Sequence, residues 1–167
     1  SARGHGEPIR LMIELGNEQD ILTLEVLKGG RKFLVASDAG RGFIVPEDEV
    51  VAQTKNGKQV LNLADKERAI AFSIVPDDAD SIAALSMGYK LLIFPIEQIP
   101  EMSRGRGVTL QRSKGDRLRD AQAFKFVDGL PWANRLIEAA ELKFWRGERA
   151  QSGRMREGKW PKKSFKG

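Results

Sequence analysis

Short apolar segments separated by polar or glycine-containing turns recur along most of the chain. Alternation of apolar and polar positions over four to eight residues, bounded by turn residues, is typical of half-buried β-strands. Such segments lie at residues 9–15, 21–27, 32–37, 42–45, 59–63, 69–75, 81–86, 90–94, 108–111 and 121–127. Most of the connections are short, as in antiparallel hairpins. The pattern therefore predicts an all-β protein.

The same pattern repeats along the chain with a period of about 48 residues. Residues 34–45 match residues 82–93 without a gap in their apolar and glycine positions. A basic glycine turn at 103–107 has counterparts around Gly57 and Gly153, and residues 3–6 resemble an offset copy. A period of 40–50 residues with several short strands per unit indicates propeller-like blades. Chance self-similarity within an all-β chain is the alternative explanation.

The repeat predicts the following organisation within one domain. Residues 1–16 end a preceding blade, 17–66 and 67–127 form two blades, 128–150 form a degenerate last blade, and 151–167 form a basic tail. Residues 47–53 are compatible with either a helical turn or an irregular crossing. The four-residue spacing of Leu136, Ala140 and Phe144, after Asn134 as a candidate N-cap, predicts a helix over 134–146. In the tail, Trp160 and Phe165 are expected to dock on the body of the domain.

Composition limits the chemistry that this chain supports. Its 167 residues are 41% hydrophobic and 31% charged, as expected for a globular domain. There is no cysteine, which excludes disulfides and thiolate metal sites. A catalytic triad would depend on the single histidine, His5, so a small hydrolytic enzyme is nearly excluded. The chain does not begin with Met, and we expect it to be a piece of a longer protein.

The net charge of +5 is distributed unevenly. Residues 154–167 carry six basic residues and one acid, and residues 104–119 also carry six basic residues and one acid. Acidic clusters at 47–49 and 77–80 balance the second group. This segregation makes a basic stripe possible, and basic stripes attract polyanions. Charge alone favours the simpler interpretation of a solvated face without a partner.

The basic glycine turns are the candidate binding elements. Arginine and lysine neutralise phosphates, and backbone N–H groups of glycine turns add hydrogen-bond donors. Such contacts carry no base information, so we expect a duplex to be bound with little sequence preference. The alternative is that these turns only close loops. The predicted DNA-binding residues are Arg3, His5, Lys55, Lys58, Arg104, Arg106, Arg112, Lys114 and Arg154.

Several segments resemble the C-terminal domain of bacterial topoisomerase IV A subunits and of their gyrase relatives. The segments are residues 6–11 (GEPIRL), 42–46 (GFIVP), 57–62 (GKQVLN) and 90–95 (KLLIFP). The resemblance covers nearly the whole chain and is strongest over residues 3–127. It implies a β-pinwheel, a propeller-like array whose blades exchange strands. It also implies binding and bending of duplex DNA on a basic outer rim, without catalysis by this domain.

The resemblance further implies a larger bacterial enzyme in the cytoplasm. The cleavage tyrosine, the ATP site and the Mg²⁺ site would lie in the catalytic core and in the ATPase B subunit, so this domain would need no cofactor. The gyrase domain carries a longer basic box, Gln-Arg-Arg-Gly-Gly-Lys-Gly, whereas this chain has the shorter turn at 103–107. Complete DNA wrapping is therefore not expected here. The alternative function is a protein-interaction propeller whose acidic crossings bind a basic partner.

Overall fold

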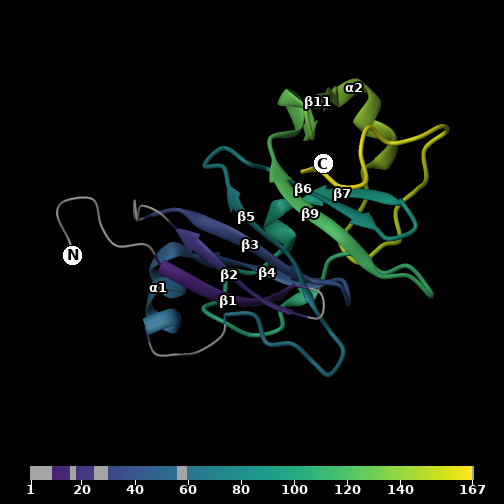
Figure 1. Cartoon of the computed structure of the whole chain (residues 1–167). Coiled ribbons are helices and arrows are strands. Elements are labelled where there is room, and N and C mark those ends of the chain that lie inside the picture. The colour runs from purple at the N-terminus through teal and green to yellow at the C-terminus, as the bar shows by residue number, and fades with distance from the viewer. Residues whose placement is uncertain (1–8, 16–17, 25–29, 56–59, 167) are drawn as a thin grey trace.

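The computed structural model describes residues 9–15, 18–24, 30–55 and 60–166. Antiparallel hairpins, arranged in two larger sheets and two smaller ones, form most of this part of the chain (Figure 1). The fold is therefore all-β with a few short helices, as the sequence predicts. Its core has two clusters: one lies within and between the two larger sheets, and the other lies between the second of these sheets and the C-terminal part of the chain.

The first large sheet has the strand order β5-β3-β4-β8. Its strands are β3 (Lys32–Ser37), β4 (Arg41–Pro46), β5 (Ala69–Val75) and the short β8 (Val108–Thr109). Five of the six β3 residues are buried, so both faces of this strand are covered. Helix α1 (Glu47–Lys55) follows β4. Residues 47–53, for which the sequence allows either a helical turn or an irregular crossing, are therefore helical.

The second large sheet has the order β7-β6-β9. Its strands are β6 (Ser81–Ser86), β7 (Leu91–Pro95) and β9 (Leu118–Phe124), and a 3₁₀ turn at Ile96–Gln98 follows β7. Strands from different predicted units share the first sheet, because β5 and β8 lie beyond residue 66 and pair with β3 and β4. Strand exchange of this kind joins neighbouring units into one body.

The structure confirms the repeat and makes its period one residue longer than the sequence pattern indicates. Strand β3 begins at residue 32 and β6 at residue 81, while β5 begins at 69 and β9 at 118. The offset is the same for both pairs of strands. Each sheet also has a register shift at the same place, between Ala36 and Ser37 and between Leu85 and Ser86. Every residue of β6 is buried, and such a strand lacks the alternation that would fix the offset in the sequence.

The hairpin turns show why the sequence pattern indicates a period that is one residue too short. The N–H of Gly40 donates to Ser37 O at 3.0 Å, and the N–H of Tyr89 donates to Ser86 O at 2.9 Å. Both residues have positive φ, 85° and 67° respectively. Tyr89 therefore occupies the position of Gly40, although the sequence pattern aligns Gly88 with it.

Smaller elements lie at both ends of the chain. An N-terminal hairpin pairs β1 (Ile9–Leu15) with β2 (Glu18–Leu24), so that β2 begins three residues before the predicted strand. A second hairpin pairs β10 (Leu130–Trp132) with β11 (Arg135–Ile137). Short helices complete the C-terminal half: a 3₁₀ turn at Phe126–Asp128, α2 (Ala139–Leu142) and a 3₁₀ turn at Lys143–Trp145.

The predicted helix over 134–146 is wrong in its first half. Asn134 lies in the tight turn between Trp132 and Arg135, which face each other in the β10–β11 hairpin. The apolar spacing is misleading because Leu136 and Phe144 are 55% and 54% exposed and do not form a buried stripe. The predicted strand over 59–63 is also absent from its described part, where Leu61 makes only an isolated bridge with Gly105.

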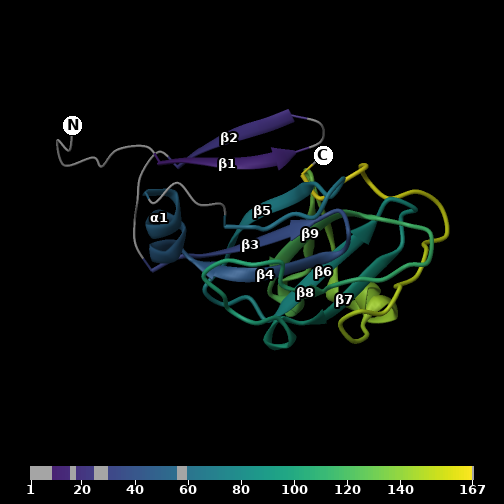
Figure 2. The same ribbon diagram turned by 90° about the horizontal axis from the view of Figure 1, so that it is seen from below.

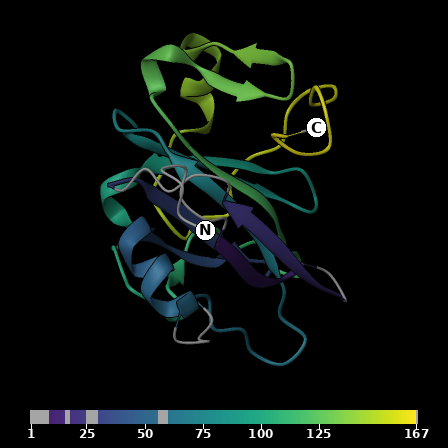
Figure 3. The same ribbon diagram turned by 60° about the vertical axis from the view of Figure 1, so that its left-hand side comes forward.

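The tail docks through its aromatic residues, as predicted. Phe165 is buried, and its ring packs edge-on against Trp132 with the centroids 4.7 Å apart. Trp160 stacks on Trp132 at 4.6 Å, and its Nε1 donates to Tyr89 O at 3.0 Å. Figure 3 shows this segment in yellow beside the green β10–β11 hairpin. The tail therefore closes the second hydrophobic cluster of the domain.

Candidate nucleic-acid interface

The antiparallel topology places the strand ends of both large sheets on two sides of the molecule. We use the word edge for each of these sides, where the turns between strands lie. The turns at 37–41, 64–69, 86–91 and 114–118 lie at the ends of the sheets that point away from α1 (Figures 1 and 2). We call these four turns, with the side chains that contact them, the tip edge. Its first tip consists of the turns 37–41 and 64–69 of the first sheet, and its second tip consists of the turns 86–91 and 114–118 of the second sheet. Residues 30–32, 46–50, 75–81, 95–101 and 124–128 lie at the other ends of the same strands. We call them the crossing edge.

Cations outnumber acids on the tip edge. Its basic residues are Arg41, Lys66, Arg68, Lys90, Arg106, Lys114, Arg117 and Arg119, and its acids are Asp38, Asp65, Glu67 and Asp116. Two of these acids, Asp38 and Glu67, are buried and already bound by other groups of the chain. The solvent-facing charge of the tip edge is therefore mainly positive.

Glu67 is the buried anchor of the first tip. Its carboxylate accepts hydrogen bonds from the Ser37 hydroxyl and from Ala64 N, and it pairs with Arg106 Nη2 at 3.2 Å. Burial alone would raise the pKa of Glu67, but these hydrogen bonds and the charge of Arg106 outweigh it and hold the pKa below its ordinary value. Glu67 is thus ionised at neutral pH and holds Arg106 at the edge.

Asp116 takes the equivalent place in the second tip, one repeat further along the chain. It accepts hydrogen bonds from the N–H groups of Arg117 at 2.8 Å and Gly88 at 2.9 Å. Burial acts to raise the pKa of Asp116, and the hydrogen bonds from Arg117, Ser86 and Gly88 with the charge of Lys90 lower it further than burial raises it. Both tips therefore use an ionised carboxylate to organise backbone and cations.

One ion pair joins the two tips. Asp38, in the first hairpin turn, accepts from Arg68 N and from Arg117 Nη1, both at 2.9 Å. Leu118 N also donates to Asp38 O at 2.9 Å, so backbone and side chain both connect the sheets. The cations of the two tips are consequently held on one continuous edge.

Two of the basic glycine turns lie against equivalent strand ends. Gly107 lies over Gly42 at the start of β4, and Gly153 lies over Leu91 at the start of β7. Both have positive φ, and a Cβ on either would come well inside 3.0 Å of a backbone carbonyl oxygen of the strand. Gly107, not Gly105, is therefore the structural counterpart of Gly153. The glycines permit close contact between two backbone segments. This is the loop-closing role that the sequence leaves open as the alternative to phosphate binding.

The predicted DNA-binding residues fall into three groups. Arg3, His5 and Lys58 lie outside the described residues, and Lys55 ends α1 with a side chain that is also outside them. Arg106 and Lys114 are exposed on the tip edge. The remaining three, Arg104, Arg112 and Arg154, are exposed in or near the glycine turns.

Within this last group, Arg154 contacts the tip edge through Leu91, and Arg112 contacts the tail. Arg112 N donates to Gln151 O at 3.0 Å, and Arg154 exchanges two backbone hydrogen bonds of 2.9 Å with Leu91. The Arg154 guanidinium also lies over the Phe144 ring, 4.7 Å from its centroid. Sequence reasoning missed Arg41, Lys66, Arg68, Lys90, Arg117 and Arg119. The acid–arginine pairs at 67–68 and 116–117, one repeat apart, were the signal for two of them.

The crossing edge has the opposite charge. Its acids are the buried Glu47, which pairs with Arg31, and Asp48, Glu49, Asp77, Asp78, Asp80, Glu97, Glu101 and Asp128, against the cations Arg31, Lys32 and Lys125. Among the described residues no group of histidine and acidic side chains is placed to hold a metal ion. The described helices also include none that is long and apolar enough to cross a membrane. The fold thus separates a basic edge from an acidic one.

A family model described as the DNA gyrase C-terminal domain, a β-propeller, matches residues 31–76 and 90–124. These segments contain every strand of the two large sheets except β6. The A subunit of DNA topoisomerase 4 from Caulobacter vibrioides is 44% identical over 158 residues, which are 93% of this chain. This chain belongs to the family of C-terminal domains that gyrase and topoisomerase IV carry on their A subunits.

Other members of this family agree with the assignment. The A subunit of DNA topoisomerase 4 is 46% identical over 79% of the chain in Rickettsia felis and 31% identical over 78% in Escherichia coli K12. The chain spans only about a fifth of the length of these curated relatives. It corresponds to their C-terminal domain, an accessory domain of a type II topoisomerase.

Solved structures support the same fold. The E. coli ParC C-terminal domain superposes with a TM-score of 0.69 at 26% identity, over 95% of this chain and 69% of that one. The DNA gyrase A C-terminal domain gives a TM-score of 0.60 at 18% identity, over 84% of this chain and 49% of that one, and this likeness concerns the fold alone. The β-pinwheel expectation is therefore confirmed at the level of the fold.

Proposed function

We propose that this domain captures and bends duplex DNA along the tip edge and presents it to a catalytic core located elsewhere in a bacterial topoisomerase IV. The observation that carries the proposal is the continuity of the basic edge across both sheets, through the Asp38–Arg117 ion pair. Cations spaced along such an edge neutralise successive phosphates, and a curved edge favours a bent duplex. The glycine turns with Arg104, Arg106, Arg112 and Arg154 extend this surface.

In the whole enzyme the domain would act together with the catalytic core and the ATPase B subunit, on the chromosome in the cytoplasm. It would hold the DNA segment to be transported, for relaxation or decatenation. DNA capture by this domain requires neither ATP nor Mg²⁺, because it uses only fixed cations and backbone N–H groups.

A salt titration tests the proposal. Anisotropy of a labelled duplex of about 24 base pairs should show an affinity that falls about 10³-fold between 50 and 200 mM salt if about six phosphates are contacted. Two unrelated duplex sequences should bind equally, with or without EDTA. Absence of binding at low salt, or binding that ignores salt, would contradict the proposal and favour a protein partner on the acidic crossing edge.

A further inference from the structure

A pocket of about 520 Å³ lies between the tail and the β6–β7 turn. Its lining is mainly apolar and includes Tyr89 and Trp160, while Arg156, Lys159, Lys162 and Lys163 supply its positive charge. We call it the tail pocket. Its volume is in the range of small-molecule sites. We propose that the tail pocket binds an unpaired nucleotide of DNA, with the base against the aromatic floor and its phosphates on the surrounding cations.

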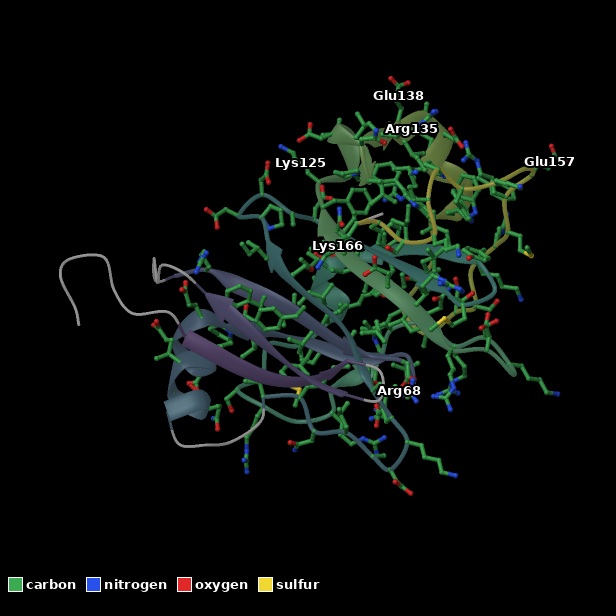
Figure 4. The ribbon with its side chains drawn as sticks, in the orientation of Figure 1. Arg68, Lys125, Arg135, Glu138, Glu157 and Lys166 are labelled. Atoms are coloured by element: carbon green, nitrogen blue, oxygen red, sulfur yellow. The ribbon has the colours of Figure 1, made fainter. Side chains whose placement is uncertain are left out.

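The charges of the tail pocket select an anion. No acidic residue lines it among the residues that the structure describes. Glu141 pairs with Arg156 Nη2 at 3.0 Å, and Glu157, which follows Arg156 in the chain, points outward from the tail loop (Figure 4). A cationic ligand would be repelled, and a free phosphate would leave the apolar floor unused. A base joined to phosphates matches both parts of the lining.

Guanidinium groups lie over both aromatic rings of the lining, and such groups offer flat surfaces on which a base can stack. The Arg119 guanidinium lies over the Tyr89 ring, 4.6 Å from its centroid, and that of Arg156 lies over Trp160 at 5.1 Å. Unpaired bases are commonly bound on aromatic rings and guanidinium planes of this kind. A paired base hides its faces in the duplex stack, so only an unpaired one can enter.

The backbone of Tyr89 supports a binding role. Its φ of 67° is one that L side chains rarely adopt, and the equivalent position of the first sheet is Gly40. Glycine would make this turn without strain, so the tyrosine is held at a conformational cost. Strained residues of this kind concentrate at ligand sites. Tyr89 also places the pocket at the end of the tip edge, next to the proposed duplex path.

The inference rests on the proposed function for its DNA partner and extends it from duplex to single-stranded DNA. Binding of three labelled probes by the 167-residue domain tests it: an oligothymidylate of about 12 nucleotides, an abasic strand of the same length, and a blunt duplex. We expect the oligothymidylate to bind at least about tenfold more tightly than the abasic strand. Equal binding of these two strands would show that phosphates suffice and would overturn the inference.

Variants locate the site. Tyr89→Gly, which keeps the turn conformation, and the double change Lys159→Gln with Lys162→Gln should each weaken oligothymidylate binding about tenfold and blunt-duplex binding less than about twofold. Lys125→Gln is the matched control, because Lys125 lies on the crossing edge and does not line the tail pocket. Photocrosslinks from 5-iodouracil should map to Tyr89 or Trp160.

The outcomes separate this inference from the proposed function. Crosslinks elsewhere, or an equal loss of both DNA forms in the variants, would overturn the inference while duplex capture stands. A blunt duplex that fails to bind at low salt would contradict the proposed function itself. A competition experiment gives a further outcome. If an acidic peptide displaces the bound oligothymidylate more strongly than the abasic strand displaces it, the inference is overturned in favour of a protein ligand.

Discussion

The two large sheets are built on the same plan but are completed by different parts of the chain. Their register shifts, hairpin turns and anchoring carboxylates all recur one repeat apart. The first sheet is extended by β8 and by the crossing after β7, whereas the tail and the β10–β11 hairpin cover the second. The shared arrangement of strands and turns produces the basic tip edge. The tail, which covers the second sheet, forms a pocket there beside the strained Tyr89.

The largest expected effect comes from the glycines that both sheets use in the same way. Gly107→Ala and Gly153→Ala should each lower the free energy of unfolding by about 3 kcal/mol, because strain at positive φ adds to a clash with a strand carbonyl. Gly115→Ala is the control, since its φ is also positive but no atom lies within 4 Å of the added Cβ. It should cost about 1 kcal/mol. Urea unfolding measures all three, and equal losses would refute the clash argument.

The carboxylate of the first tip gives the next effect. Glu67→Gln should destabilise the fold by about 2 kcal/mol at pH 7, because the Ser37 and Arg106 contacts lose a buried charged acceptor. The pKa of Glu67 is lowered in the folded state, so its stabilisation is present above the unfolded pKa and disappears as the pH falls through the folded pKa. Unfolding curves of variant and wild type should therefore converge at low pH. A gap that stays constant with pH would contradict this account.

A smaller effect distinguishes the two tips as DNA contacts. Lys66→Gln in the first tip and Lys114→Gln in the second should each lower duplex affinity about fivefold at 0.15 M salt and reduce the salt slope by about one. Lys125→Gln, on the crossing edge, serves as the control and should change neither. If only one tip responds, the duplex does not follow the edge across both sheets.

The smallest effect is expected at the tail. Asp120 is buried and accepts hydrogen bonds from the N–H groups of Ala121 and Phe165. Burial raises the pKa of Asp120, and this effect outweighs the hydrogen bonds and the charge of Lys166, which lower it. Because the pKa is higher in the folded state than in the unfolded state, ionisation of Asp120 as the pH rises disfavours the folded state. Asp120→Asn retains a hydrogen-bond acceptor. At pH 7 it should leave the free energy of unfolding unchanged or raise it by less than about 1 kcal/mol. A marked destabilisation, measured by urea unfolding, would mean that the charge itself holds the tail.

Much of this fold follows from local sequence patterns. Most strand positions, the hairpins, the aromatic docking and the repeat are predictable, because strands and turns have local signals. The offset is not, since fully buried strands such as β6 carry no alternation and Tyr89 stands where a glycine is expected. The helix prediction over 134–146 fails because the exposed Leu136 and Phe144 imitate an apolar stripe.

The candidate site was less predictable than the fold. The glycine turns direct attention to Arg106, but not to Arg117 or Arg119, which reach the edge only once β9 pairs with β6. Their role depends on contacts between residues far apart in the chain, such as Arg117 with Asp38. No local pattern contains that information. Only the spacing of the two acid–arginine pairs anticipates it.

The edge pairing of β4 has a consequence for synthesis of the chain. This strand ends at Pro46, but its outer neighbours, Glu101 beside Ile44 and then β8, leave the ribosome only after β5, β6 and β7. Until then its free edge is open to pairing with other nascent chains. The second hairpin must therefore be made before the first sheet can close. A chain released early would be prone to aggregate, even with every strand of its first hairpin present.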